Sequence, residues 1–184
     1  MEPSPRPWKH LSSEPGPDLL IARARFDRLE NPRTGAHLRR MVLDTADWVN
    51  VVALTEERRL VVVRQYRFGT REVTLEIPGG VIDPGERPED AAVRELREET
   101  GFTASRWSLL AVVEPNPAFQ NNRCHHYLAE GARRTHELEL DPGEDIAVDT
   151  VTLEEARELV QRGVIRHSLV ITALARLLDL RVRH

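Results

Sequence analysis

The sequence predicts a mixed α/β fold in which helices flank a β-sheet. Three observations predict it: Val-rich strand segments gather in the first half of the chain, one helical segment lies between strands, and two helical segments follow the last strand. Elements in this order pack as layers around one core, with the sheet between helices. A chain of 184 residues is long enough to bury such a core.

The N-terminal segment is predicted to combine an arm with a β-hairpin. Residues 1–18 hold prolines at positions 3, 5, 7, 15 and 17, which block regular structure, so we expect a loose arm there. Between residues 22 and 27 apolar and charged residues alternate, with Asp27 on the charged face, and this predicts a half-solvated strand. A turn at NPRTG and a return strand at 37–44 complete the hairpin. We therefore predict two parts, residues 1–45 and residues 46–184.

The remaining elements are predicted from residue type and from the proline and glycine residues at their ends. Residues 48–55 and 58–67 are Val-rich and are predicted to be central strands. A helix is expected from Pro88 to Thr100, because proline suits a first helical position and Gly101 suits the residue just past a helix end. The other predicted elements are strands at 72–78, 105–115, 122–132 and 146–151, a helix at 152–162 that opens with capping-box spacing, and a helix at 168–178.

Composition excludes several classes of protein. Apolar residues make up 40% and charged residues 30% of the chain, as in a globular protein, and the net charge of −4 does not favour nucleic acid as a partner. A single cysteine, Cys124, excludes a disulfide scaffold, and Cys124-His125-His126 lacks the second ligand pair of a zinc site. No signal peptide and no membrane-spanning run is recognised, so we predict a cytoplasmic protein without a membrane partner.

The predicted helix 88–100 carries three glutamates on one side. At about 100° per residue, Glu98 and Glu99 project within about 60° of Glu95, while Val93 and Leu96 are expected to face the core. Like charges at this spacing repel one another. Carboxylate oxygens are preferred ligands of Mg²⁺ and Mn²⁺, and a bound cation would relieve the repulsion. The alternative is a solvated acidic face paired with Arg94 and Arg97.

The spacing around this helix resembles the signature of the Nudix hydrolase family. Gly80 is followed after five residues by Glu86 and after seven more by the run Arg94 to Phe102, RELREETGF, with no position of the signature missing. The resemblance implies an α/β/α sandwich with a mixed β-sheet, here with a small N-terminal antiparallel β extension. It also implies hydrolysis of a nucleoside diphosphate linked to another moiety, with Mg²⁺ or Mn²⁺, one to three ions per site, as cofactor.

The resemblance also assigns roles by position. Glu95 and Glu99 would be the principal metal ligands, Glu98 an additional ligand and the Gly79 carbonyl a backbone ligand. Arg94 would act in catalysis or, with Glu86, support the glutamates.

Segments outside the signature resemble the branch of ADP-ribose pyrophosphatases and nucleotide-sugar hydrolases. VRQYRFG followed by LEIPGG implies that Arg67 and Glu76 contact the substrate, although Arg67 could also be an ordinary strand-end arginine. The loop NPAFQNN departs from the branch, so the sugar is left open between ADP-ribose, GDP-mannose and similar compounds. Phe119, Gln120 and Asn122 are the candidate substrate contacts of this loop. Loop packing is the alternative for Phe119.

The segment LDPGEDIAV resembles a loop of the same branch that supplies an acid to the site. Glu144 is therefore the leading candidate for general base and a further metal ligand, with Glu98 as its rival, and an ordinary loop acid as the alternative. Other readings of the whole chain are a nucleoside triphosphate, coenzyme A or dinucleotide pyrophosphohydrolase, and a non-catalytic nucleotide-sugar sensor. The branch resemblance also implies a homodimer, with residues 1–45 as the dimerisation segment.

Overall fold

The computed structural model describes residues 5–181, which form two compact units. Within the described residues, one unit comprises residues 5–46 and 114–122, and the other comprises residues 47–113 and 123–181. Contacts thus group the loop 114–122 with the N-terminal strands. The sequence-based division at residue 45 remains a proposal. No helix within residues 5–181 is long and apolar enough to span a membrane.

The first unit is a three-stranded antiparallel sheet of β1 (Lys9–Asp18), β2 (Arg23–Glu30) and β3 (His37–Asp44), in that order. The prediction of a loose arm is wrong for residues 9–18, which pair with β2. The prolines are tolerated because β1 is an edge strand of this sheet, and because the register shifts between Pro15 and Asp18. Residues 1–4, also predicted as arm, lie outside the described part.

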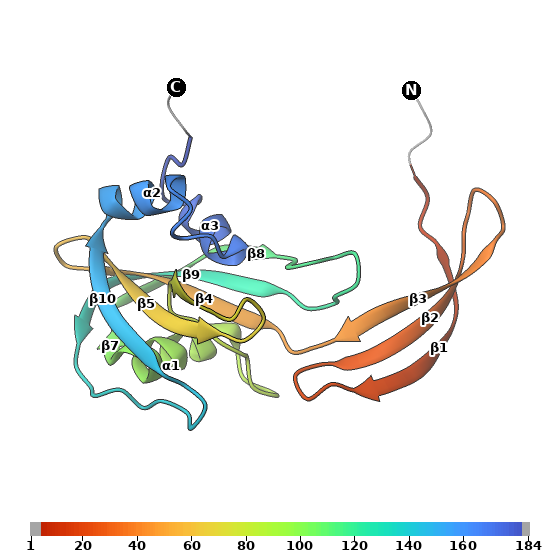
Figure 1. The fold of residues 1–184 in the computed structure, drawn as a ribbon, viewed down its shortest axis with the longest axis horizontal. Helices are drawn as coiled ribbons and strands as arrows, with labels where there is room; N and C mark the ends of the chain where they lie inside the picture. The colour runs from red at the N-terminus through yellow and green to blue at the C-terminus, as the bar shows by residue number, and fades with distance from the viewer. Residues whose placement is uncertain (1–4, 182–184) are drawn as a thin grey trace. The chain divides into compact units, whose positions relative to one another are not determined.

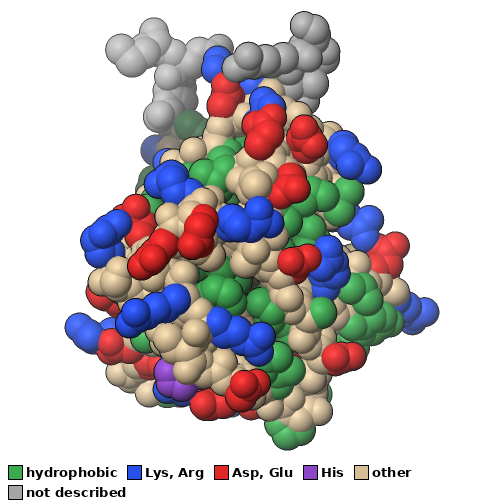
Figure 2. Space-filling view, turned by 90° about the vertical axis from the view of Figure 1, so that its left-hand side faces the viewer, with side chains coloured by type: hydrophobic (Ala, Val, Ile, Leu, Met, Phe, Trp, Pro, Cys, Tyr) green, Lys and Arg blue, Asp and Glu red, His purple; other side chains and the backbone are tan. Residues whose placement is uncertain are grey.

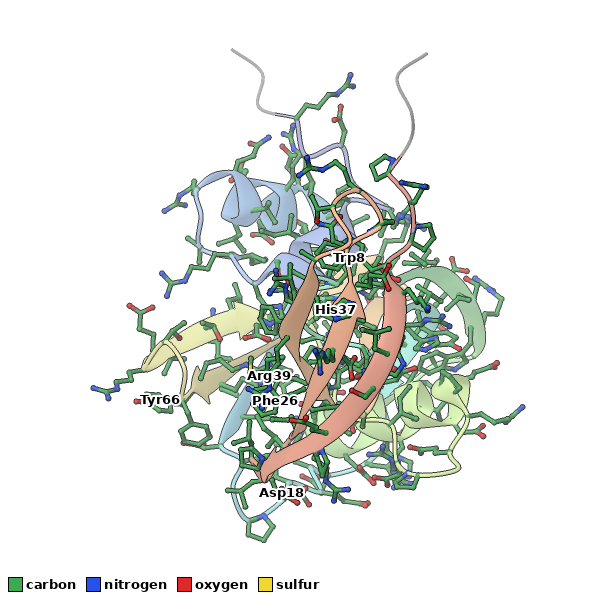
Figure 3. The ribbon with its side chains drawn as sticks, turned by 90° about the vertical axis from the view of Figure 1, so that its right-hand side faces the viewer. Trp8, Asp18, Phe26, His37, Arg39 and Tyr66 are labelled. Carbon is green, nitrogen blue, oxygen red and sulfur yellow. The ribbon has the colours of Figure 1, made fainter. Side chains whose placement is uncertain are left out.

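Side chains on the N-terminal sheet pair across strands. The Arg39 guanidinium lies 3.6 Å from the centre of the Phe26 ring. Figure 3 labels both residues on this sheet. Asp27 was predicted to face solvent, yet it is buried, because it accepts hydrogen bonds from Ser13 Oγ at 2.6 Å and from Arg25 Nε at 2.9 Å. A bonded carboxylate can be buried where an isolated one cannot.

The second unit is built on a seven-stranded mixed sheet (Figure 1). Its main path runs β10 (Ile146–Thr152), β5 (Arg59–Arg67), β4 (Trp48–Thr55), β9 (Cys124–Arg134) and β7 (Phe102–Thr103), while β6 (Glu72–Glu76) pairs with β5 and β8 (Arg106–Val113) pairs with β9. Only β4 and β9 run parallel. The central position predicted for the Val-rich strands is confirmed. The short strand β7 was not predicted.

Helices cover both faces of this sheet. On one face α1 (Pro88–Thr100) packs Ala91, Ala92 and Leu96 against the apolar residues of β4 and β9. On the other face α2 (Leu153–Gln161) and α3 (Ser168–Leu174) cover a second core cluster that includes Val52, Leu60 and Val62. Because alternate residues of β4 point to opposite faces, one Val-rich strand serves both cores. The predicted sandwich is therefore confirmed.

Helix ends follow the predicted signals, with one exception. Pro88 opens α1 and Gly101, at φ 72°, caps it, while Thr152 and Glu155 form the capping box of α2. The last helix is shorter than predicted, since α3 ends at Leu174 and the chain continues in turns. Figure 2 shows acidic and basic side chains interspersed over one face of the molecule, without a continuous field of either sign.

Candidate active site

A short segment after β6 forms one wall of the site. β4 pairs with β5 only at Leu54 and Leu60, so the first half of β4 is free to bond elsewhere. There the Val49 N–H donates to the Gly80 carbonyl at 2.9 Å, and the Val51 N–H donates to the Pro78 carbonyl at 2.8 Å. The Pro78–Gly80 segment is thereby held beside β4, and the Gly79 N–H donates to Glu99 Oε2 at 2.9 Å.

Both glycines of this segment are required by close approach. A Cβ on Gly79 would lie 2.2 Å from the Val49 carbonyl oxygen. A Cβ on Gly80 would lie 2.4 Å from Glu95 Oε1. Only glycine leaves room for backbone contact with β4 on one side and for a carboxylate of α1 on the other.

Helix α1 places its glutamates against this segment. Leu96 is fully buried, as predicted, but Val93 is 41% exposed, so its predicted core position is wrong. The small Ala91 and Ala92 face the sheet instead, so Val93 lies at the edge of the buried face of the helix. Glu99 is 3% exposed even though it is a carboxylate.

A cavity of about 480 Å³ collects most of the predicted acids. Its walls come from the end of β5, from the segment after β6, from α1 and from the loop between β9 and β10. The lining residues are Gln65, Arg67, Gly79, Gly80, Val81, Asp83, Arg94, Glu95, Glu98, Glu99, Glu139, Asp141 and Glu144. We call it the acidic cavity. Gln65, Asp83, Glu139 and Asp141 were not singled out from the sequence, although the last two belong to the acidic run ELELDPGED that contains Glu144.

The electrostatics of the acidic cavity disfavour negative charge on two glutamates. Burial, together with the charges of Glu95 and Glu144, raises the pKa of Glu99 to about 8. Burial also raises the pKa of Glu95, with Arg94 opposing the shift. A cation in the cavity would favour the ionised form of both carboxylates.

Arg94 connects the acids of α1 to the loop that precedes it. Its guanidinium donates to both oxygens of Glu86 at 2.9 Å, to Glu95 Oε1 at 2.8 Å and to Glu98 Oε2 at 3.2 Å. It also donates to the Val81 carbonyl at 3.0 Å. These bonds orient two of the candidate ligands and hold the loop 81–86 against the helix.

The residues present fit a divalent cation in their chemistry. Within residues 5–181, no three His, Cys, Asp or Glu side chains already stand in the arrangement of a metal site. Glu95 and Glu98 bond to Arg94 instead, and Glu99 bonds to the Gly79 N–H. Their oxygens nevertheless line one cavity, and oxygen ligands are those that Mg²⁺ and Mn²⁺ prefer. The metal-ligand roles of Gly79, Glu95, Glu98, Glu99 and Glu144 remain predictions.

Glu144 reaches the acidic cavity from an exposed loop. Its Oε2 accepts a hydrogen bond from the Asp141 N–H at 3.0 Å, which closes a turn around Pro142 and Gly143. Glu144 lines the cavity together with the glutamates of α1 and adds to the rise in the pKa of Glu99. The loop thus brings an acid that lies far along the chain to the predicted site.

Arg67 and Glu76 form a bonded pair beside the acidic cavity. Arg67 Nε donates to Glu76 Oε1 at 2.8 Å and one terminal nitrogen donates to Oε2 at 2.6 Å. Thr74 Oγ1 donates to Glu76 Oε1 at 2.6 Å. Burial opposes ionisation of Glu76, but these bonds hold its pKa below the ordinary value. Glu76 therefore positions Arg67, and substrate contact by either residue remains a prediction.

The three loop candidates bond within the other unit. The Phe119 carbonyl accepts from the Leu43 N–H at 2.7 Å, Gln120 forms a bridge with Leu43, and Asn122 Nδ2 donates to the Ala46 carbonyl at 3.1 Å. Asn122 is buried by this contact, which gives it a structural role in the loop. Substrate contacts by these residues remain predictions.

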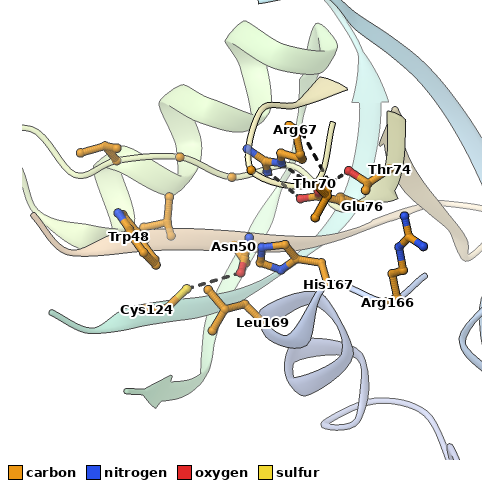
Figure 4. Close-up of a pocket in the computed structure, with 15 residues that line it drawn as sticks. Trp48, Asn50, Arg67, Thr70, Thr74, Glu76, Cys124, Arg166, His167 and Leu169 are labelled. Carbon is orange, nitrogen blue, oxygen red and sulfur yellow. Dashed lines mark hydrogen bonds and ion pairs between the residues drawn. The ribbon is translucent and has the colours of Figure 1, made fainter. Parts of the chain in front are cut away.

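A second cavity, of about 550 Å³, was not anticipated from the sequence. It lies on the face of the sheet that α3 covers, and its lining includes Trp48, Asn50, Cys124, His167 and Leu169 (Figure 4). Arg67, Gly79, Gly80 and Val81 line both cavities. No local motif marks Trp48, Asn50, His167 and Leu169, because they lie in two segments more than 100 residues apart.

A family model, two proteins of known activity and one solved structure resemble this chain. The family model described as the NUDIX domain matches residues 45–174. An ADP-ribose pyrophosphatase of Bacillus subtilis (strain 168) is 40% identical over 114 residues, 61% of this chain and 62% of that protein. An ADP-ribose pyrophosphatase of Mycobacterium tuberculosis is 32% identical over 169 residues, 91% and 81% of the two chains. A crystal structure of an ADP compounds hydrolase shares the fold, with a TM-score of 0.85, 24% identity and coverage of 96% and 95%.

Proposed function

Because this chain belongs to the Nudix family, we propose that it hydrolyses the diphosphate bond of nucleoside diphosphate sugars. The products would be a nucleoside monophosphate and a sugar phosphate. The single observation that carries the proposal is the acidic cavity, where Glu95, Glu98, Glu99 and Glu144 face Arg67 and the Gly79–Gly80 backbone. ADP-ribose is the first candidate substrate, because two similar proteins are ADP-ribose pyrophosphatases.

The chain's own residues would divide the work as follows. Glu95, Glu98 and Glu99 would hold Mg²⁺ or Mn²⁺, and the ion would neutralise charge on the diphosphate and lower the pKa of a nearby water. Arg67, held in place by Glu76, binds a phosphate oxygen, since a guanidinium suits phosphate geometry. Arg94 keeps Glu95 and Glu98 oriented.

A carboxylate that accepts the proton of the attacking water completes the reaction. Glu144 lines the cavity from a loop outside α1 and does not bond to Arg94, so its oxygens are free of the network that holds Glu98. We therefore favour Glu144 as the general base and keep Glu98 as the rival. The homodimer and the cytoplasmic location, which were predicted from the sequence, remain proposals.

A substrate panel tests the proposed function. ADP-ribose, ADP-glucose, GDP-mannose, UDP-glucose, coenzyme A, a dinucleoside tetraphosphate and common triphosphates are incubated with Mg²⁺ and excess phosphatase, and phosphate release is measured. We expect release from diphosphate sugars, abolished by a chelator. Phosphate release only from triphosphates or coenzyme A would show that these compounds, and not nucleoside diphosphate sugars, are the substrates. Silence on the whole panel would contradict hydrolysis.

A further inference from the structure

The second cavity adjoins the acidic cavity. The two share Arg67 and the three residues Gly79 to Val81, so the wall between them is the segment that contacts Glu99 and Glu95. A substrate with its diphosphate against the glutamates can extend one of its ends into the second cavity. At about 550 Å³, this cavity is in the range of small-molecule sites.

Two polar side chains in the second cavity have little to bond with in the protein. Asn50 is 9% exposed, and its only side-chain hydrogen bond within residues 5–181 is from Cys124 Sγ to Oδ1 at 3.4 Å. His167 lines the cavity with a half-buried ring, and its Nδ1 atom is enclosed by protein without a partner in the same part of the chain, so Nδ1 reaches a ligand only when the ring turns. An unbonded buried polar atom destabilises a fold, and a ligand that bonds to it removes the penalty.

The other polar groups of the cavity are already engaged. Glu76 accepts from Arg67 and Thr74, and Thr70 Oγ1 donates to the Arg67 carbonyl at 3.4 Å. Burial, with the nearby charge of Arg67, lowers the pKa of His167, although Glu76 opposes the shift. At neutral pH His167 is therefore an uncharged imidazole, with one donor and one acceptor. Arg166, which also lines the cavity, forms an ion pair with Glu72. The groups left with little to bond are therefore an amide and an imidazole, both neutral.

The remaining walls are largely apolar. Trp48 and Leu169 line the cavity beside Asn50 and Cys124, and Figure 4 shows Trp48 at one end and Arg166 at the other. A sugar carries a hydroxyl on nearly every carbon and needs many polar partners. A nucleobase is flat, stacks on aromatic rings, and presents a few donors and acceptors along one edge.

We propose that the second cavity binds the nucleobase end of the substrate, with Asn50 and His167 bonding to the base edge and Trp48 contacting its face. This inference rests on the proposed function, because it takes the diphosphate to lie in the acidic cavity. The sugar phosphate end then extends away from the second cavity. Asn50 and His167 become the residues that select the base.

Calorimetric titration of the two kinds of product tests the assignment. The full-length protein with Mg²⁺ is titrated with AMP, GMP, UMP and CMP, and with ribose 5-phosphate, glucose 1-phosphate and mannose 1-phosphate. We expect one nucleoside monophosphate to bind, and His167→Leu and Asn50→Leu to weaken it by about tenfold or more. His167→Gln keeps a donor and an acceptor and should recover part of the affinity, while sugar phosphate affinity should not change.

Matched controls keep the result interpretable. His136→Leu removes a histidine that lines neither cavity and should leave nucleotide affinity unchanged. Thermal unfolding checks that each variant is folded. If Asn50→Leu does not fold, the test depends on His167→Leu and His167→Gln, because His167 is only half-buried and its replacement disturbs the core less. Unchanged nucleotide affinity in His167→Leu, or weakened sugar phosphate affinity instead, overturns the inference.

The same data separate this inference from the proposed function. If the protein hydrolyses diphosphate sugars but the His167 variants bind nucleotide as tightly as the wild type, the proposed function is retained and the base site is rejected. A protein that is silent on the substrate panel but binds a nucleotide through His167 would retain the base site and reject the function.

Discussion

At the residue scale, the unusual group is Glu99, a carboxylate enclosed by protein. It accepts one hydrogen bond, from the Gly79 N–H, and its pKa is raised to about 8 by burial and by Glu95 and Glu144. Ionised at neutral pH, it is stable only with a compensating positive charge nearby. This environment fits the predicted role of Glu99 as a metal ligand.

Replacement of Glu99 should separate activity from stability. Glu99→Gln should reduce kcat/KM by about a hundredfold or more, because a metal ligand is lost. In chelator at pH 7 its free energy of unfolding should not fall, since a carboxyl with a pKa of about 8 is mostly protonated there and the amide is a neutral group of the same shape. The phosphate-release assay and urea unfolding measure both. Glu137→Gln, at an exposed loop position, is the control, and retained activity at saturating Mg²⁺ would contradict the ligand role.

His126 should make stability depend on pH. It is fully buried, neither ring nitrogen has a partner within residues 5–181, and burial, with Arg176 and His125, lowers its pKa to about 4. The unfolded chain binds the proton near pH 6.5 and the folded chain does not, so stability falls as pH falls from 6.5 towards 4.

Urea unfolding of the wild type and of His126→Leu, each at pH 7 and pH 5, measures this effect. Comparison of the two proteins cancels the other titrating groups. The wild type should lose roughly 2 kcal/mol more than the variant between the two pH values. Equal losses in both proteins would show that His126 is not the cause.

At the element scale, the contact between the Pro78–Gly80 segment and α1 builds the site. The segment takes the place of β5 beside the first half of β4, and this brings backbone atoms to the glutamates. Its two glycines meet different neighbours: the Val49 carbonyl at Gly79 and the Glu95 carboxylate at Gly80. A backbone neighbour cannot yield, whereas the end of a side chain can.

Alanine at these two positions should therefore have different effects. Gly79→Ala should destabilise the fold by about 1–3 kcal/mol, because its Cβ meets backbone. Gly80→Ala should change stability less and reduce kcat/KM about tenfold or more, because it displaces the Glu95 carboxylate. Gly143→Ala, with no atom within 4 Å of its Cβ, is the matched control for stability. Equal destabilisation at positions 79 and 80 would contradict this account.

At the scale of the whole molecule, the acidic cavity should link metal binding to stability. A cation that binds only the folded protein raises its free energy of unfolding, by about 2.7 kcal/mol at a concentration 100 times the dissociation constant. Thermal unfolding in chelator and in rising Mg²⁺, at constant ionic strength, measures this. The midpoint should rise for the wild type and stay nearly constant for Glu99→Gln. A Mg²⁺-independent midpoint in the wild type would contradict a metal site.

The features that could be predicted from the sequence are those that depend on local geometry. Helix periodicity brings Glu95, Glu98 and Glu99 to one side of α1, and Pro88 and Gly101 define its ends. Val-rich runs predicted the two central strands, and the spacing from Gly80 to Phe102 predicted the family. Each of these signals lies within a few tens of residues.

Contacts between segments far apart in the chain could not be predicted from the sequence. The prolines of residues 9–18 predicted an arm, but an outer strand tolerates them, so β1 forms by pairing with β2. Val93 satisfied the helix period yet stays exposed, because two alanines bring α1 to the sheet on another side. Trp48, Asn50 and His167 share a cavity although more than 100 residues separate the first from the last. Such contacts depend on the packing of whole elements, which no local pattern encodes.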